Sequence, residues 1–429
     1  MKKAIITLLV FLMVITSVFA AEDSGNGDWY NYNTGEFPID FTFHPGLARY
    51  GAMGRSGLAL TTRLDSFFVN PAALAKKGFA LAIPSATISV YNLSAALNDS
   101  KTVEIIDKLT HGNATNADTA KLAVNLLGNL GRGRNLIATM DASIAMKIGI
   151  FGLATNMQVK LHGLNTGSSM LSQSIIPEVN LAQTVGLGFR ILNFDAVSLS
   201  VGASVHAIYK AYFKGIDANT IVGLIGGTEE ADPTKLLLWD TPIVGGFAVP
   251  IDVGVNVGFF NNALVLGTTL SNINGKYYMN SYGSAGDLVN SLSTGAMAPP
   301  EGHQVAASEK FTIKTPLSFN IGLAFAPRVP VLRPVLTFDF VDIIDLFTSD
   351  NFQASDILLH MNFGAEFGLW DVLTVRGGID RGYISLGVGF WLPFMEIDVA
   401  YGRQEFGDEI GDKPVDALTI KFSLGYDKK

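Results

Sequence analysis

The sequence predicts an all-β fold, a closed transmembrane β-barrel of fourteen antiparallel strands. Apolar and polar residues alternate over repeated segments, and the connections between these segments are alternately long and short. Within 416–427, for example, Ile420 and Phe422 share one face, and Lys421 lies on the other. A period of two identifies β-strands, because successive side chains point to opposite faces. Repeated alternation with long and short connections is typical of outer-membrane barrels.

The alternation places each strand in turn. The first, third, fifth, seventh, ninth and thirteenth connections are long, with the main outer loops at 93–135, 214–247 and 274–315. The even-numbered connections are tight turns, which such barrels place in the periplasm. An even number of strands returns the chain to the periplasmic side. The predicted strands are 80–92, 136–147, 149–160, 181–192, 196–213, 248–259, 262–273, 316–326, 331–341, 358–369, 371–380, 383–392, 394–403 and 416–427.

The N-terminus predicts export. Lys2 and Lys3 precede an uncharged apolar run, and Val18-Phe19-Ala20 resembles a signal peptidase site. The run could instead anchor the chain as a helix, but it is shorter than the ~20 apolar residues that a span needs. We therefore expect residues 1–20 to be a cleaved signal peptide that directs the protein to the bacterial outer membrane.

Composition agrees with a barrel in lipid. Charged residues make up 16% of the chain, below the roughly 25% of soluble domains, and the mean hydropathy is +0.32. No second apolar run of about 20 residues could form a transmembrane helix. The apolar surface is therefore expected on strands that face membrane lipid. The net charge of -8 argues against nucleic acid as a partner, and the absence of Cys excludes disulfides.

A search for catalytic or metal-binding motifs finds none. The histidines are widely spaced, with no pair at metal-ligand spacing. A serine and a histidine could still meet in space, but no local signature supports a catalytic pair. We therefore expect no enzyme activity, no cofactor and no metal site. The histidines are His44, His111, His162, His206, His303 and His360.

The first outer loop contains two segments with helical spacing of apolar residues, at 101–110 and 119–130. They predict short amphipathic helices over the barrel mouth. Such helices could form a lid that covers the pore, or an apolar landing site for a hydrophobic ligand.

Residues 21–79 lack the alternation and carry two motifs. Ala48-Arg49-Tyr50-Gly51-Ala52-Met53-Gly54 comes first, and Asn70-Pro71-Ala72 follows further along. Together they resemble the N-terminal hatch of the FadL-type long-chain fatty acid transporters of bacterial outer membranes; related hatch-bearing barrels of unproven transport activity are also similar. The resemblance implies that 21–79 form a hatch, or plug, in the lumen of a barrel formed by 80–429. It also implies that Asn70, Pro71 and Ala72 are a hatch motif near the wall.

Charged residues on the lumen face form a second candidate site. A charge that faces lipid at mid-depth would cost ~2–4 kcal/mol, so these side chains are expected to point inward. They could form a solvated wall, or a paired network that seats the hatch. The set comprises Arg49, Arg55, Arg63 and Asp65 in the hatch, and Glu366, Arg376, Asp380, Glu396, Asp398 and Lys421 in the last five strands.

Two functions remain open. In the first, hydrophobic small molecules or fatty acids pass by passive uptake through the plugged barrel and leave through a hatch shift or a strand kink. Pro84, Pro250 and Pro334 are candidates for such a kink, because proline removes ladder hydrogen bonds. In the second, a non-transporting barrel acts in secretion, surface attachment or assembly. Both imply outer-membrane lipid and, during biogenesis, the barrel-insertion machinery as partners.

Overall fold

The computed structural model describes residues 45–113, 133–165, 173–217, 235–329, 331–348, 356–370, 372–406 and 414–427, with a few single residues between these ranges. The predicted signal peptide at 1–20 and the predicted helical segment at 119–130 lie outside the described ranges.

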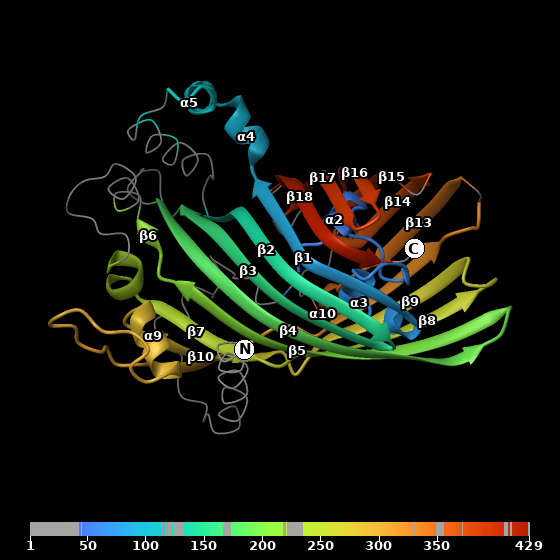
Figure 1. The fold of residues 1–429 in the computed structure, drawn as a ribbon, viewed down its shortest axis with the longest axis horizontal. Coiled ribbons are helices and arrows are strands. Elements are labelled where there is room, and N and C mark those ends of the chain that lie inside the picture. The colour runs from blue at the N-terminus through green and yellow to red at the C-terminus, as the bar shows by residue number, and fades with distance from the viewer. Residues whose placement is uncertain are drawn as a thin grey trace.

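The chain forms one closed antiparallel barrel whose wall is crossed fourteen times, which confirms the predicted fold (Figure 1). The sheet closes because β18 pairs with β1. Three crossings consist of two collinear segments each, and β6 is a two-residue extension beside β4. The strands are β1 (Gly78–Tyr91), β2 (Gly133–Gly149), β3 (Phe151–Asn165), β4 (Gln173–Asn193), β5 (Val197–Phe213), β6 (Ile216–Asp217), β7 (Ile243–Ala248), β8 (Ile251–Phe259), β9 (Leu264–Ile273), β10 (Lys276–Tyr282), β11 (Lys310–Lys314), β12 (Ser318–Phe325), β13 (Leu332–Phe340), β14 (Met361–Leu369), β15 (Leu373–Asp380), β16 (Tyr383–Leu392), β17 (Met395–Glu405) and β18 (Pro414–Asp427).

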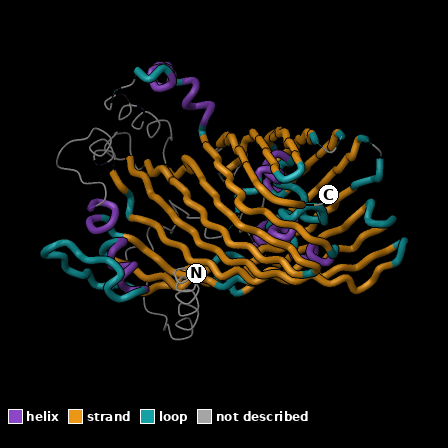
Figure 2. Tube along the Cα trace, in the orientation of Figure 1, coloured by secondary structure: helices purple, strands orange, loops and turns teal. Residues whose placement is uncertain are grey.

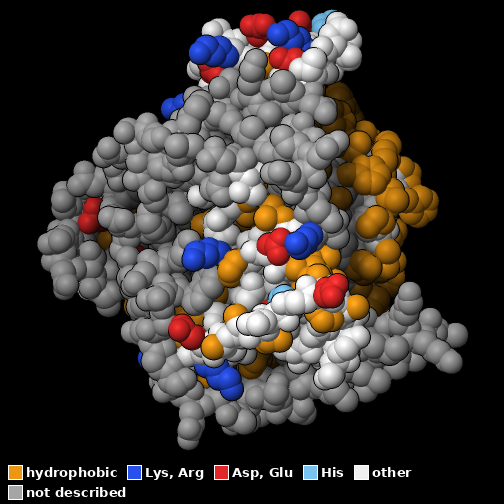
Figure 3. Space-filling view, turned by 90° about the vertical axis from the view of Figure 1, so that its left-hand side faces the viewer, with side chains coloured by type: hydrophobic (Ala, Val, Ile, Leu, Met, Phe, Trp, Pro, Cys, Tyr) orange, Lys and Arg blue, Asp and Glu red, His pale blue; other side chains and the backbone are white. Residues whose placement is uncertain are grey.

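The alternation of the sequence becomes the two faces of the wall. On β18, Ile420, Phe422 and Leu424 are exposed on the outside, whereas Lys421 and Ser423 are buried inside. Apolar side chains gather along one flank of the barrel in Figure 3. An apolar exterior of this kind is the surface that a bilayer solvates.

No helix among the described residues is long enough and apolar enough to cross a membrane.

Long connections and short turns lie at opposite ends of the barrel, as predicted (Figure 1). The predicted bounds of the outer loops were too wide, because β2 begins at Gly133, β7 begins at Ile243, β10 extends to Tyr282 and β11 begins at Lys310. Around prolines and Asn-Gly pairs the alternation of the sequence breaks off and then resumes, so the outer parts of these strands were predicted as loop.

The outer loops carry short helices. The prediction of a helix at 101–110 is confirmed by α5 (Ser100–Thr110), which follows α4 (Leu93–Asn98). Asp99 caps α5 by accepting hydrogen bonds from the backbone N–H and the hydroxyl of Thr102. The Thr102 hydroxyl bond lowers the pKa of Asp99, which keeps the cap ionised in mild acid. The other loop helices are the π-helix η5 (Leu236–Asp240), α9 (Ala285–Leu292), α10 (Ile343–Thr348) and α11 (Asp356–Leu359).

The described segment before β1, residues 45–77, lies inside the barrel, surrounded by the wall (Figure 2). It contains α2 (Ala48–Ala52), α3 (Ser66–Val69) and the 3-10 helix η3 (Pro71–Ala75). Helix α2 packs against β15, β16 and β17, and η3 packs against β4, β5 and β8. We call residues 45–77 the hatch. Its contacts with opposite sides of the wall place it across the lumen.

Candidate functional site

Asn70 holds the start of η3 and joins it to the wall. Its Oδ1 accepts a hydrogen bond from Ala72 N at 2.9 Å, and its Nδ2 donates to Leu58 O at 3.1 Å and to Asn256 Oδ1 on β8 at 3.0 Å. The side chain is fully buried, so each of these bonds replaces one to water. Pro71 suits the first helical position, because that position needs no N–H donor.

Glycines in the wall allow the backbone of η3 to approach closely. A Cβ atom at Gly202 on β5 would lie 2.3 Å from the carbonyl carbon of Pro71. A Cβ atom at Gly254 on β8 would lie 2.0 Å from Asn70 Oδ1. Any side chain at these two positions would push the hatch away from the wall. The glycines of the lumen face thus form a seat for the Asn70-Pro71-Ala72 segment.

The opposite side of the hatch is held by side-chain acceptors of the wall. Asp339 Oδ2 on β13 accepts hydrogen bonds from Gly57 N at 2.6 Å and from Leu58 N at 2.9 Å. Gly54 N donates to Ser385 Oγ on β16 at 2.9 Å. The sequence analysis did not select Asp339, although it lies on the lumen phase of its strand.

Arg49 belongs to the first of three buried ion-pair clusters. Its guanidinium donates two hydrogen bonds to Glu366 on β14, at 2.9 and 3.0 Å. Glu366 also accepts from Arg376 Nε on β15 at 2.8 Å, and Arg376 in turn pairs with Asp398 on β17. All four side chains are buried. Because one carboxylate serves both arginines, the hatch is linked directly to the wall.

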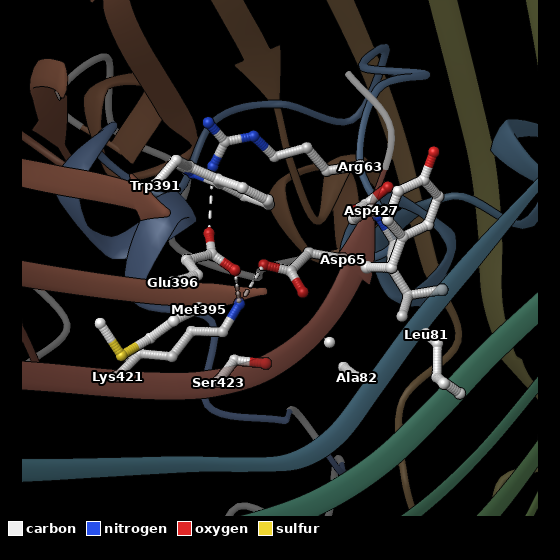
Figure 4. Close-up of a pocket in the computed structure, with 13 residues that line it drawn as sticks. Arg63, Asp65, Leu81, Ala82, Trp391, Met395, Glu396, Lys421, Ser423 and Asp427 are labelled. Atoms are coloured by element: carbon white, nitrogen blue, oxygen red, sulfur yellow. Dashed lines mark hydrogen bonds and ion pairs between the residues drawn. The ribbon is translucent and has the colours of Figure 1, made fainter. Parts of the chain in front are cut away.

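The second cluster lies toward the short-turn end, where Figure 4 shows its members pointing toward one another. Lys421 Nζ lies 2.9 Å from Asp65 Oδ2 and 3.2 Å from Glu396 Oε2. Arg63 Nη1 lies 3.1 Å from Glu396 Oε1, and its guanidinium stacks 4.5 Å from the ring centroid of Trp391. Here the hatch supplies one cation and one carboxylate, and the wall supplies the complementary pair.

The structure brings all ten predicted charged residues to the boundary between hatch and wall. Arg55 is the most weakly held: its Nε lies 3.6 Å from Asp380 Oδ2, and 49% of its side chain is exposed. Its ion pair therefore contributes little to the seating of the hatch.

The sequence analysis missed a third cluster, in the outer half of the lumen. Glu178 on β4 accepts hydrogen bonds from Lys210 Nζ and Asn180 Nδ2, both at 2.8 Å, and lies 2.8 Å from His162 Nε2. Lys160 Nζ is 3.8 Å away. These residues lie on the lumen phase of β3, β4 and β5. The period-two rule that found the charges of the last strands could therefore have found them.

Next to this cluster the lumen face becomes apolar. Ten buried side chains from β4, β5, β7, β10 and β11 pack together, and Phe43 packs against them. The lumen of a water-filled porin is polar, so an apolar interior is unusual for a barrel. The ten are Ile176, Ala182, Ile208, Tyr212, Val244, Ala248, Tyr277, Met279, Phe311 and Ile313.

Two of the three candidate prolines lie at irregularities of the wall. Pro84 sits in a β-bulge of β1, where the pairing with both neighbours shifts between Ala82 and Ser85. Pro250 separates β7 from β8. The third candidate, Pro334, does not lie at an irregularity: its pairing with β14 continues in register at Phe367, and the ladder between β12 and β13 ends at Leu336 and does not reach it.

The break at Pro250 belongs to a line of breaks across three adjacent crossings. β9 and β10 separate at 274–275, and β11 and β12 at 315–317. Side chains bridge the line: Asn272 Nδ2 donates to Pro316 O at 3.2 Å, and Asn272 N donates to Asp252 Oδ1 at 2.9 Å. In this part of the wall, side chains replace some of the regular ladder bonds.

Within the described part of the chain, no group of three or more His, Asp or Glu side chains is arranged to hold a metal ion. His162, His206 and His303 each contact one carboxylate, at 2.8, 3.1 and 2.8 Å. His44 lies outside the described residues.

Comparisons with known proteins give structural likeness only. No protein-family model and no curated protein matches the chain. The toluene transporter TodX of Pseudomonas putida matches at 12% identity, with 91% of this chain and 99% of that chain covered and a TM-score of 0.45. A FadL homologue of Pseudomonas aeruginosa matches at 14% identity, with 91% and 100% covered and a TM-score of 0.43. The CymD monoaromatic hydrocarbon channel matches at 12% identity, with 89% and 97% covered and a TM-score of 0.44. At these values, functional arguments rest on the residues of the chain itself.

Proposed function

We propose that the chain is an outer-membrane channel, rather than an enzyme, for the passive uptake of hydrophobic compounds, long-chain fatty acids among them. The observation that carries the proposal is the apolar cluster of ten side chains inside the outer half of the lumen. Burial of apolar ligand surface is favourable by roughly 25 cal/mol per Å². An apolar lumen therefore favours hydrophobic solutes over ions and sugars.

The hatch supports selectivity. It lies across the lumen and is bonded to both sides of the wall, so a wide aqueous pore is absent at this depth. A ligand that enters from the long-loop end would reach the apolar cluster before it reaches the hatch. The buried Lys210 and Glu178 beside this cluster offer polar partners for a ligand head group.

The line of breaks in β7/β8, β9/β10 and β11/β12 supports an exit toward the bilayer. Backbone pairing is interrupted along this line, so fewer ladder hydrogen bonds must break there than along an unbroken strand, at about 0.5–1.5 kcal/mol each. Asn272 bridges both neighbouring crossings, through its side chain to Pro316 O and through its backbone N–H to the Asp252 carboxylate, so an opening would break these two bonds first.

The test exchanges an apolar for a polar side chain of nearly equal volume. Met279 is fully buried in the cluster, so Met279→Gln keeps the shape of the cluster and adds an amide that an apolar ligand cannot satisfy. The control is Met279→Leu, which keeps the site apolar. Uptake of labelled oleate and toluene is measured in cells that lack their own transporter for them.

We expect uptake to fall about tenfold in the Gln variant, since ~1.4 kcal/mol corresponds to a factor of ten, and to persist in the Leu variant. If cells with the wild-type chain take up neither compound faster than cells with an empty vector, the channel proposal is wrong. A non-transporting role in secretion, attachment or assembly would then remain.

A further inference from the structure

Two small cavities follow the contact between the hatch and the wall formed by β18, β1 and β2. One, of about 30 Å³, lies toward the short-turn end and is drawn in Figure 4. We call it the outer cavity because it is the nearer of the two to the short-turn end of the barrel. The inner one, of about 20 Å³, lies next to it. Leu64, Asp65, Ala82 and Lys421 line both. We call this contact, with its two cavities, the seam.

The wall itself creates the space. The bulge in β1 lies at the seam, and the residues at its two ends, Ala82 and Ser85, line the cavities. Neighbouring wall positions carry small residues, namely Ser143 and Ala145 on β2 and Ser423 on β18. A bulge bends and locally disrupts a strand. Small side chains then leave the room that it creates unfilled.

Both cavities are large enough for water, and charged and polar side chains are among the residues that line them. A cavity needs roughly 10–15 Å³ to hold one water molecule. In the inner cavity, Asn156 is buried on β3, and its Oδ1 has no hydrogen-bond partner among the described residues. Such an atom is normally satisfied by ordered water. The seam is therefore suited to a short file of water molecules.

The charges along the seam are unequal in number. Carboxyl groups come from Asp65, Glu396, Asp427 and Asp141. The only cationic side chains in the linings of these two cavities are Arg63 and Lys421. A narrow passage lined by an excess of one sign of charge concentrates ions of the opposite sign.

We propose that the seam is a hydrated pathway that admits small monovalent cations from the short-turn end to the inner cavity. The ion pair between Lys421 and Asp65 is its constriction, because these two residues line both cavities and their charged atoms lie 2.9 Å apart. This pathway is separate from the apolar outer lumen, and it does not depend on the proposed uptake of hydrophobic compounds.

The test uses Ag⁺, a small monovalent cation that binds a thiol and displaces its proton. The chain contains no Cys, so a single introduced thiol is the only thiol of the protein, and the chain without it measures binding to Met and His. Ser423→Cys places it in the outer cavity and Ser143→Cys in the inner one. The control is Ser56→Cys, because Ser56 is fully buried in the hatch and lines neither cavity. The full chain is refolded into vesicles in nitrate buffer, and folding is checked by heat modifiability.

We expect Ag⁺ to modify positions 423 and 143 at least about tenfold faster than position 56. When each rate is divided by the rate of the same reagent with free cysteine, the linear anion dicyanoaurate should react at 423 and 143 at least about tenfold more slowly than Ag⁺. Lys421→Met, added to Ser143→Cys, should raise the rate of Ag⁺ modification at 143 several-fold, because it removes both the ion pair that forms the constriction and the positive charge of Lys421.

Modification at 143 that is no faster than at 56 would overturn the proposal. The proposal would also be overturned if Ag⁺ and dicyanoaurate reacted at equal rates, each relative to its rate with free cysteine. Equal relative rates would indicate general opening of the barrel. If Ser143→Cys does not fold, Ala82→Cys gives the same comparison, since Ala82 lines both cavities.

Discussion

Glu366 is the wall residue on which the seating of the hatch depends most. It accepts two hydrogen bonds from Arg49 of the hatch and one from Arg376 of β15, and all three side chains are buried. We predict that Glu366→Gln, which keeps the shape but removes the charge, destabilises the folded protein strongly.

The magnitude follows from what the substitution leaves behind. Arg376 retains Asp398, whereas Arg49 loses its charged partner and retains only neutral acceptors, namely the amide oxygen of the introduced Gln and the backbone and hydroxyl oxygens of Thr62, the last two at 3.2 and 3.5 Å. An uncompensated buried charge costs about 3–5 kcal/mol. The double variant Arg49→Met/Glu366→Gln should be less destabilised than the sum of the two single variants, by about 0.5–3 kcal/mol.

The free energy of unfolding is measured by urea titration in lipid vesicles, with tryptophan fluorescence as the readout. Glu104→Gln on α5 is the matched control, because Glu104 forms an exposed pair with Lys108 at 2.8 Å. Its removal should cost less than about 0.5 kcal/mol. A cost below 1 kcal/mol for Glu366→Gln would refute the view that this ion-pair cluster holds the hatch.

Three further predictions concern the seat of the hatch and the topology. Gly202→Ala should lower the free energy of unfolding by about 1–3 kcal/mol in the same titration. Gly377→Ala is the control and should be nearly neutral, since the nearest atom to its Cβ would be at 3.5 Å. Equal effects of the two substitutions would contradict the argument that the hatch needs a glycine at 202. Asn70→Asp removes both Nδ2 donors and adds a buried charge, so we expect a hatch that proteases cleave faster in vesicles, and unchanged cleavage would count against this role. Thr294→Cys in the loop between β10 and β11 should react with an impermeant maleimide on intact cells, and Asp195→Cys in the short turn between β4 and β5 should not; the reverse pattern would invert the topology.

The barrel could be predicted from the sequence because each wall residue faces either lipid or the interior. This choice imposes a period of two on every strand, so the phase of Lys421 follows directly from the apolar residues on either side of it. The period of two does not predict the strand where the strand itself is irregular. At Pro250 and at Asn274-Gly275 the alternation breaks off, and the outer parts of these crossings were mistaken for loop.

For the candidate site too, some features could be predicted from the sequence and others could not. Charges on the last strands could be selected from their phase, but their partners could not, because pairing depends on where the hatch lies in the lumen. The Glu178 cluster was missed because the strands were predicted too short: His162 and Glu178 lie between the predicted strands 149–160 and 181–192, so no face was assigned to them. For the glycine seat, the phase shows only that a glycine faces the lumen: Gly202 and Gly368 share this phase, but only Gly202 lies against the hatch.

The two sides of the hatch are held by different forces, and this difference predicts where movement would begin. At η3 the backbone touches wall glycines, so any displacement loses close packing at once and breaks the hydrogen bond from Asn70 to Asn256 on β8. At the seam, water or ions can replace each bond of Lys421 as it breaks, because cavities already lie on both sides. Amide hydrogens of residues 62–65 should therefore exchange faster than those of residues 72–75. Faster exchange at 72–75 would show instead that the hatch pivots about the seam.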